Sequence, residues 1–140
     1  MPMIRLIYFS CAADELTMAD IQQILTAARR NNPSQGIGGM LCFERRYFLQ
    51  VLEGERAAVN ALYLDIADDN RHQDIQILSY EEVQQPAFQQ WSMGFAPSND
   101  DFYRLLSELG QNQFNPQAMT ADQALHFTLH LAQQTQIQPH

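Results

Sequence analysis

The sequence predicts an α+β fold in which one β-sheet carries two helices on one face and further helices on the other. Three observations support this prediction. Strand-like and helix-like segments alternate along the N-terminal two-thirds of the chain, two strand segments are separated by only three polar residues, and the C-terminal part holds two more amphipathic segments. With 140 residues, 46% of them hydrophobic, the chain is long enough to bury one core.

The first strand is predicted over residues 4–11, which are rich in β-branched and aromatic side chains. A helix should follow from Thr17 to about Arg30, because Thr17 and Asp20 have the spacing of a capping box and the next apolar residues recur at helical intervals. The segment 31–36 contains Pro33 and Gly36 and is expected to end the helix.

The next four segments complete a regular pattern. Residues 44–46 are short enough to join two strands as an antiparallel hairpin. Apolar residues spaced three and four apart indicate a second helix, and Trp91, Met93 and Phe95 alternate as in a half-buried strand. The predicted elements are strands over 37–43 and 47–53, a helix over about 55–69, and strands over 75–80 and 91–95.

The resulting order, βαββαββ, is typical of a ferredoxin-like sheet with both helices on one face. The first and third strands are then central neighbours, and alternation along them predicts that Tyr8 and Gln50 meet beneath the helices. The amphipathic segments 101–109 and 121–134 should cover the opposite face, with Thr120 capping the second of them.

The net charge of −8 argues against binding to nucleic acid or to an anionic membrane surface. All eight basic residues are arginines, and no apolar run reaches the roughly 20 residues of a membrane span. The N-terminus does not resemble a signal peptide, so a cytoplasmic location is expected. Cys11 and Cys42 are too few for a disulfide framework, and His126 and His130 lack further ligands in register, so no metal site is predicted.

One group of residues suggests a binding site. Tyr8, Gln50 and the adjacent Asn31 and Asn32 converge in the predicted fold, beside apolar helix residues that include Ile24 and Ile66. Amides and a phenol above an apolar slot suit a flat heteroaromatic ligand with carbonyls and ring nitrogens. A purely structural Tyr8–Gln50 hydrogen bond in an apolar core is the alternative reading.

The chain resembles the BLUF family of blue-light sensors that use flavin, in particular its short stand-alone photoreceptors of the PixD type. The matching motifs lie between residues 4 and 96 and are Arg5-Leu6-Ile7-Tyr8, Asn31-Asn32-Pro33, Gly36-Ile37, Gly39-Met40-Leu41-Cys42, Phe48-Leu49-Gln50-Val51-Leu52-Glu53-Gly54, Arg71-His72 and Trp91-Ser92-Met93. This resemblance implies a flavin-binding domain over 1–97, followed by a C-terminal helical cap over 98–140. It also implies FAD as cofactor, with FMN or riboflavin as alternatives.

By the same resemblance, Tyr8 would donate an electron and a proton toward the photoexcited flavin, and Gln50 would bridge it to the ring. The implied photoactive switch consists of Tyr8, Gln50, Trp91 and Met93. The implied cofactor-binding residues are Tyr8, Ile24, Asn31, Asn32, Gln50, Ile66, Arg71, His72 and Met93. The chain departs from the family pattern at Ala28, Gly38 and Asp65, and Asp65 leaves the phosphate end short of positive charge.

The implied output is a signal rather than catalysis. A BLUF protein of this type would act through a homo-oligomer, such as a decamer of stacked rings, or through a response-regulator-like partner. Two other functions are weighed against it: a light-independent interaction module, and an acylphosphatase-like enzyme. The enzyme is disfavoured because the loop over 12–16 is acidic and has no arginine for a phosphate.

Overall fold

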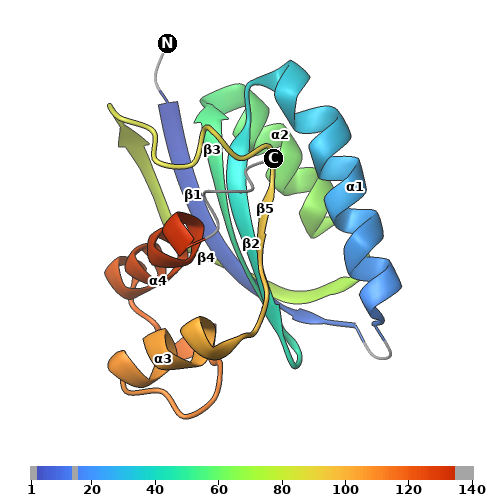
Figure 1. Ribbon diagram of the computed structural model, residues 1–140. Helices are drawn as coiled ribbons and strands as arrows, with labels where there is room; N and C mark the ends of the chain where they lie inside the picture. The colour runs from blue at the N-terminus through green and yellow to red at the C-terminus, as the bar shows by residue number, and fades with distance from the viewer. Residues whose placement is uncertain (1–2, 14–15, 135–140) are drawn as a thin grey trace.

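The computed structural model describes residues 3–13 and 16–134, so Asp14 and Glu15 of the acidic loop lie outside the described residues. Figure 1 shows a central sheet with helices on both sides. In chain order the elements are β1 (Met3–Ala12), α1 (Met18–Gln35), β2 (Gly38–Glu44), β3 (Tyr47–Glu55), α2 (Arg56–Ala67), β4 (His72–Val83), β5 (Gly94–Ala96), α3 (Asp100–Glu108), a single 3-10 turn η1 (Pro116–Ala118) and α4 (Ala121–Gln134).

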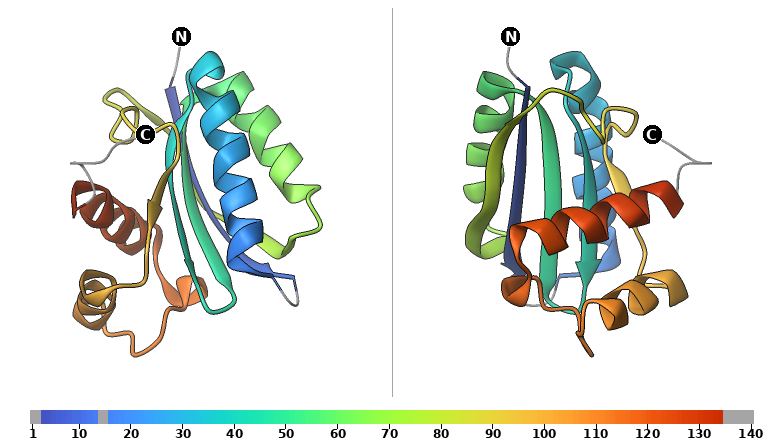
Figure 2. Two further views of the ribbon diagram at one scale, coloured as in Figure 1. Left: turned by 45° about the vertical axis from the view of Figure 1, so that its right-hand side comes forward. Right: turned by 90° about the vertical axis from the view of Figure 1, so that its left-hand side faces the viewer.

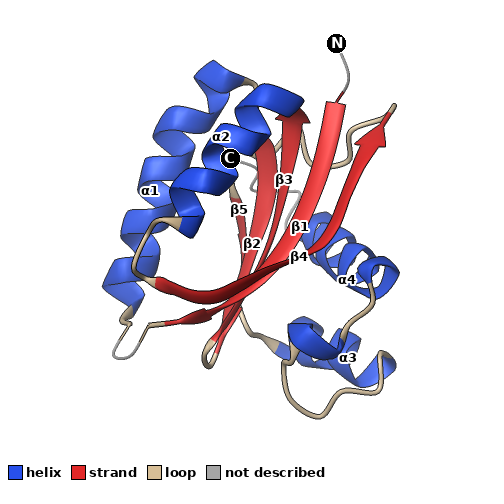
Figure 3. Ribbon diagram, turned by 180° about the vertical axis from the view of Figure 1, so that it is seen from behind, coloured by secondary structure: helices blue, strands red, loops and turns tan. Residues whose placement is uncertain are grey.

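The sheet has the strand order β4-β1-β3-β2-β5, which confirms the ferredoxin-like prediction. Its pairs are antiparallel except for β2 and β5, which run parallel. α1 and α2 lie on one face, and α3 and α4 lie on the other (Figure 2). Viewed from behind, β4 forms one edge of the sheet (Figure 3).

Alternation along the strands divides the core into two clusters. In β1, Leu6 and Tyr8 belong to the cluster beneath α1 and α2, whereas Ile7 and Phe9 belong to the cluster beneath α3 and α4. The second cluster is closed by three aromatic rings from the C-terminal part, Phe102, Phe114 and Phe127. Strands β1, β2 and β3 are therefore buried on both faces.

α1 begins as predicted but ends later. Thr17 and Asp20 form a reciprocal capping box at its start. The prediction that the helix stops near Arg30 is wrong, because α1 passes through Pro33 and ends at Gly36 with a left-handed φ of 67°. A proline in the last turn removes only one helical hydrogen bond, and the Gly36 N–H then caps the carbonyls of Asn32 and Pro33.

Other element boundaries also differ from the prediction. β3 continues past Gly54 to Glu55, and β4 spans twelve residues instead of the six predicted. β4 was underpredicted because it is an edge strand whose residues are mostly exposed or half-buried, so its sequence shows little apolar alternation. Across residues 3–13 and 16–134, no helix is long and apolar enough to cross a membrane.

Candidate functional site

Tyr8 and Gln50 are cross-strand partners at the centre of the sheet, as the alternation predicted. The Tyr8 hydroxyl donates a hydrogen bond to Gln50 Oε1. Gln50 Nε2 in turn donates to the sulfur of Met93 at 3.3 Å. All three side chains are buried, so this chain of contacts is shielded from water.

Burial decides the protonation state of Tyr8. Removal from water raises the pKa of the Tyr8 phenol well above its usual value, and the charges of Tyr63 and Asp69 act in the same direction. Tyr8 is therefore a neutral hydroxyl that keeps its proton and directs it at Gln50.

The end of α1 supplies two amides with different roles. Asn32 is buried, and its Nδ2 donates to the Ser92 carbonyl at 2.6 Å, which leaves Oδ1 available as an acceptor. Asn31 is exposed, and its side chain has no hydrogen-bond partner among residues 3–13 and 16–134. α1 thus presents the Asn31 amide and the Asn32 Oδ1 atom to the pocket.

A pocket of about 230 Å³ opens between α1, α2 and the helix-facing side of the sheet. Its lining combines aliphatic side chains with three amides, and its charged residues are exposed or half-buried. The lining residues are Ile24, Ala27, Ala28, Leu41, Leu62, Ile66 and Met93, the amides of Asn31, Asn32 and Gln50, and the polar residues Asp65, Asp69, Arg71 and His72.

Eight of the ten residues singled out by sequence line this pocket: Ile24, Asn31, Asn32, Gln50, Ile66, Arg71, His72 and Met93. Tyr8 does not line it, but it reaches the pocket through its hydrogen bond to Gln50. Trp91 is the exception, because it is buried on the opposite face of the sheet beside Phe88.

The prediction that Trp91 and Met93 share one sheet face is therefore wrong. Both residues precede β5, which begins only at Gly94, and the chain bends at Ser92 and Met93. Alternation holds only in extended backbone, so this bend places Met93 beneath the helices and Trp91 beneath the cap. The Trp91 Nε1 atom is buried without a hydrogen-bond partner in the described part of the chain.

His72 lines the pocket as a neutral ring. Its Nδ1 lies 2.7 Å from the Ser10 hydroxyl, and its ring packs on Phe48 and toward the edge of Tyr8. Burial lowers the pKa of His72 to about 4, with the Asp69 charge opposing this shift and the Arg71 charge adding to it. Ser10 was missed in the sequence, since a serine within a strand gives no sign of its cross-strand contact.

Arg71 is already paired with a carboxylate. It forms three side-chain hydrogen bonds to Asp69, the shortest 2.6 Å, and these bonds are the main cause of the lowered pKa of Asp69. With Asp65 also on the lining, the charged residues of the pocket are two acids and one arginine. An anionic group bound there would meet a guanidinium whose charge is already balanced.

The chain matches a protein-family model and several known proteins. The family model described as sensors of blue light using FAD covers residues 3–94. Photoactivated adenylate cyclase subunit alpha of Euglena gracilis is 40% identical over 73 residues, which are 52% of this chain and 7% of that protein. The blue light- and temperature-regulated antirepressor of Escherichia coli K12 is 34% identical over 70 residues, or 50% of this chain and 17% of that protein.

Solved structures match over nearly the whole chain. The photo-activated state of BlsA has a TM-score of 0.86 at 33% identity, and the match covers 92% of this chain and 94% of that one. The dark-state BLUF protein BlrB has a TM-score of 0.81 at 26% identity, with 96% and 97% covered. By contrast, the chain spans less than a fifth of the curated relatives named above, so the cyclase activity of the Euglena protein is not transferred to it.

Proposed function

The chain belongs to the BLUF family of sensors of blue light using FAD, and from this premise we propose that it is a photoreceptor that binds FAD non-covalently in the pocket between α1 and α2. The observation that carries the proposal is the buried hydrogen-bond chain Tyr8–Gln50–Met93 at the base of that pocket. The proposed output is a signal, and no enzymatic activity is assigned to the chain.

The residues present fit a flavin. A flat ring with an apolar body and a polar edge matches a slot with aliphatic walls from both helices and amides from α1 and β3. Asn31, Asn32 and Gln50 would hold the polar edge, and Ile24 and Ile66 would flank the ring. When bound, the flavin supplies absorption of blue light and an electron acceptor.

The volume indicates which part of the cofactor the pocket holds. At about 230 Å³ it lies below the roughly 300–1,000 Å³ of sites that enclose a drug-sized ligand, so we assign the ring to the pocket and the phosphate-bearing chain to its mouth. The lining offers Arg71 and His72 to this part of the cofactor, but His72 is neutral and Arg71 is shared with Asp69. Binding therefore depends mainly on the ring, and FMN or riboflavin would also fit.

The chain's own residues provide a two-state element. Tyr8 holds a proton beside Gln50 Oε1, and the Gln50 amide can exchange its donor and acceptor groups within nearly the same volume. Exchange would turn Oε1 toward the Met93 sulfur, which has no proton to donate, and would break that contact. Met93 directly precedes β5, and β5 leads into α3, so the change reaches the cap.

A single absorption experiment tests the proposal. Purified protein should be yellow, should show a reversible red shift under blue light, and should release its pigment on acid precipitation. A colourless protein that cannot be reconstituted with FAD would instead favour the light-independent interaction module. Light scattering in the dark and under light would then show whether the signal changes a homo-oligomer, such as a decamer of stacked rings, or must pass to a response-regulator-like partner.

A further inference from the structure

Three consecutive carbonyls just before β5 each accept one hydrogen bond from a neighbouring element. The Gly39 N–H donates to Trp91 O at 3.0 Å, and Asn32 Nδ2 donates to Ser92 O at 2.6 Å. Arg29 Nε donates to Met93 O at 2.9 Å. Residues 91–93 form no regular secondary structure, so these bonds decide where the segment lies.

Arg29 differs from the other donors to this segment. Asn32 and Gln50 line the pocket, and the Gly39 donor is a backbone group, whereas the Arg29 side chain does not line the pocket. Arg29 is partly buried, and loss of hydration lowers the pKa of its guanidinium. It forms no ion pair with any residue in the described ranges, so its bond to Met93 O is its main polar contact there.

The same residue, Met93, thus receives two bonds from different elements. Its carbonyl is held by α1 through Arg29, and its sulfur is held by β3 through Gln50. A sulfur acceptor is weak, so the Gln50 contact persists only if the Met93 backbone is already in place. A charged donor makes a stronger bond to a carbonyl than a neutral donor does.

We propose that Arg29 is a positioning residue of the light switch: it fixes the Met93 backbone so that the sulfur stays within reach of Gln50. This inference rests on the proposed photoreceptor function. Without Arg29, the segment is free to leave the position it has in this structure, and the Gln50 amide, when it turns back, forms its bond to the Met93 sulfur less often.

The test is Arg29→Met, which keeps much of the aliphatic stem and removes the donor. Arg30→Met is the matched control, because Arg30 is exposed, makes no side-chain hydrogen bond or ion pair to a described residue, and changes the net charge equally. In Arg29→Met we expect flavin binding and the red shift to persist. Hydrogen exchange of the amides at 93–96 should accelerate about fivefold, as loss of one such bond predicts, and dark recovery should slow by a similar factor.

In Arg29→Lys, both the exchange rate and the recovery rate should return part of the way to their wild-type values, since the lysine ammonium group can still donate to the carbonyl. Exchange and recovery rates in Arg29→Met equal to those of Arg30→Met would overturn the inference, and so would faster exchange with unchanged recovery. Exchange is measured on flavin-free and on flavin-loaded protein in the dark. A wild type that shows no red shift would overturn the proposed function, and the exchange of the flavin-free protein would still report separately on the Arg29 contact.

Discussion

At the scale of single residues, the Gln50 amide joins two partners of different chemistry. The Tyr8 phenol both donates and accepts, whereas the Met93 thioether only accepts. Turning the amide over therefore preserves a bond to Tyr8 with reversed polarity and removes the bond to Met93. Because a buried hydrogen bond contributes about 1 kcal/mol net, the two orientations are close enough in energy for a ligand to select between them.

Replacing Gln50 by Leu should abolish the light-induced red shift while flavin remains bound, because Leu has nearly the same volume and no amide. Tyr8→Phe should have the same effect, since it removes the proton that Gln50 accepts. Tyr63→Phe is the control: the Tyr63 ring packs edge-on against Tyr8 but makes no hydrogen bond to Gln50. Difference spectra before and after blue light measure all three, and a full red shift in Gln50→Leu would remove the amide from the switch.

His72 predicts a pH dependence of stability. Its pKa is about 4 in the folded protein and about 6.5 in an unfolded chain, so at pH values between these the unfolded chain binds the extra proton. The free energy of unfolding should be unaffected by His72 above pH 6.5 and should fall as the pH drops toward 4, by about 2–3 kcal/mol in total.

Urea denaturation at pH 7 and at pH 4.5 measures this effect. His72→Gln should show a smaller loss of stability between the two pH values than wild type, because Gln has no proton to gain and can still bond to Ser10. His126→Gln, on α4 away from the pocket, is the matched control. An equal loss in wild type and in His72→Gln would show that other groups cause the acid sensitivity.

At the scale of elements, the sequence predicts most where the backbone is regular. The βαββαββ order, the Tyr8–Gln50 pairing and the bounds of α4 follow from alternation, helical spacing and the Thr120 cap. Helix and strand ends depend on single bonds instead. Pro33 remains inside α1 because Gly36 caps the helix one turn later, and the bend at Ser92 separates Trp91 from Met93.

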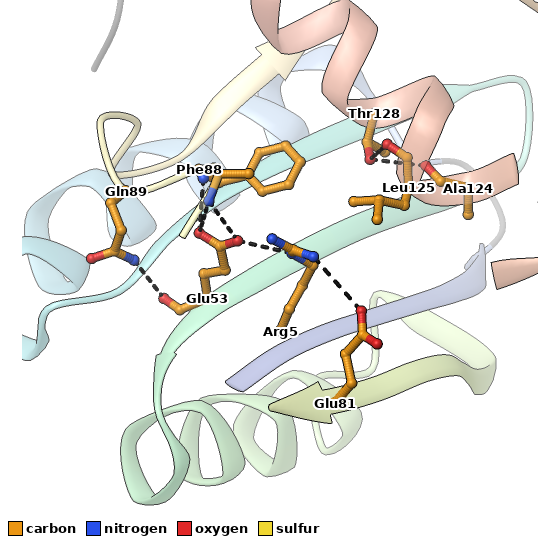
Figure 4. A network of polar contacts seen from close by, with 9 residues as sticks. Arg5, Glu53, Glu81, Phe88, Gln89, Ala124, Leu125 and Thr128 are labelled. Carbon is orange, nitrogen blue, oxygen red and sulfur yellow. Dashed lines mark hydrogen bonds and ion pairs between the residues drawn. The ribbon is translucent and has the colours of Figure 1, made fainter. Parts of the chain in front are cut away.

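The buried carboxylate of Glu53, on β3, pairs with Arg5 of β1 and also binds the segment that follows β4. Figure 4 shows Glu53 accepting from Arg5 and from backbone N–H groups, including that of Phe88. The Ala87 N–H also donates to this carboxylate, and Gln89 donates to the Glu53 carbonyl. Gly38 permits this approach, because a Cβ there would lie 2.2 Å from the Phe88 carbonyl oxygen.

Glu53→Gln should lower the free energy of unfolding by about 3 kcal/mol, because it leaves Arg5 buried without its carboxylate and turns an amide donor toward backbone donors. Glu81→Gln is the matched control. Glu81 also contacts Arg5, at 3.6 Å, but its side chain is 53% exposed, so its loss should cost less than about 1 kcal/mol. Urea midpoints compare the two, and equal effects would contradict the role given to the Glu53 network.

At the scale of the whole molecule, the sheet separates the pocket from the cap while connecting them. Sequence reasoning located the pocket because Tyr8 and Gln50 occupy predictable faces of regular strands and the two asparagines lie at the predicted end of the first helix. It missed the Arg29 contact, since the accepting carbonyl of Met93 lies in an irregular segment, and it missed the Asp69–Arg71 pairing, which lies in the turn between α2 and β4. The division at residue 97 remains a prediction, but residues on both sides of it share one buried cluster.

That shared cluster predicts how the molecule unfolds. Phe102 and Phe127 of the cap pack in one cluster with Ile7 and Phe9 of the sheet, and the same cluster contains Trp91, the one tryptophan of the sequence. Removing the cap would expose a whole apolar sheet face, so cap and sheet should unfold as a single cooperative unit. Trp91 fluorescence and far-ultraviolet circular dichroism should therefore give superimposable urea transitions. Phe127→Ala should move both transitions to lower urea by the same amount, which corresponds to a loss of about 3–5 kcal/mol in the free energy of unfolding. A Trp91 transition at lower urea than the loss of secondary structure would instead show that the cap detaches first.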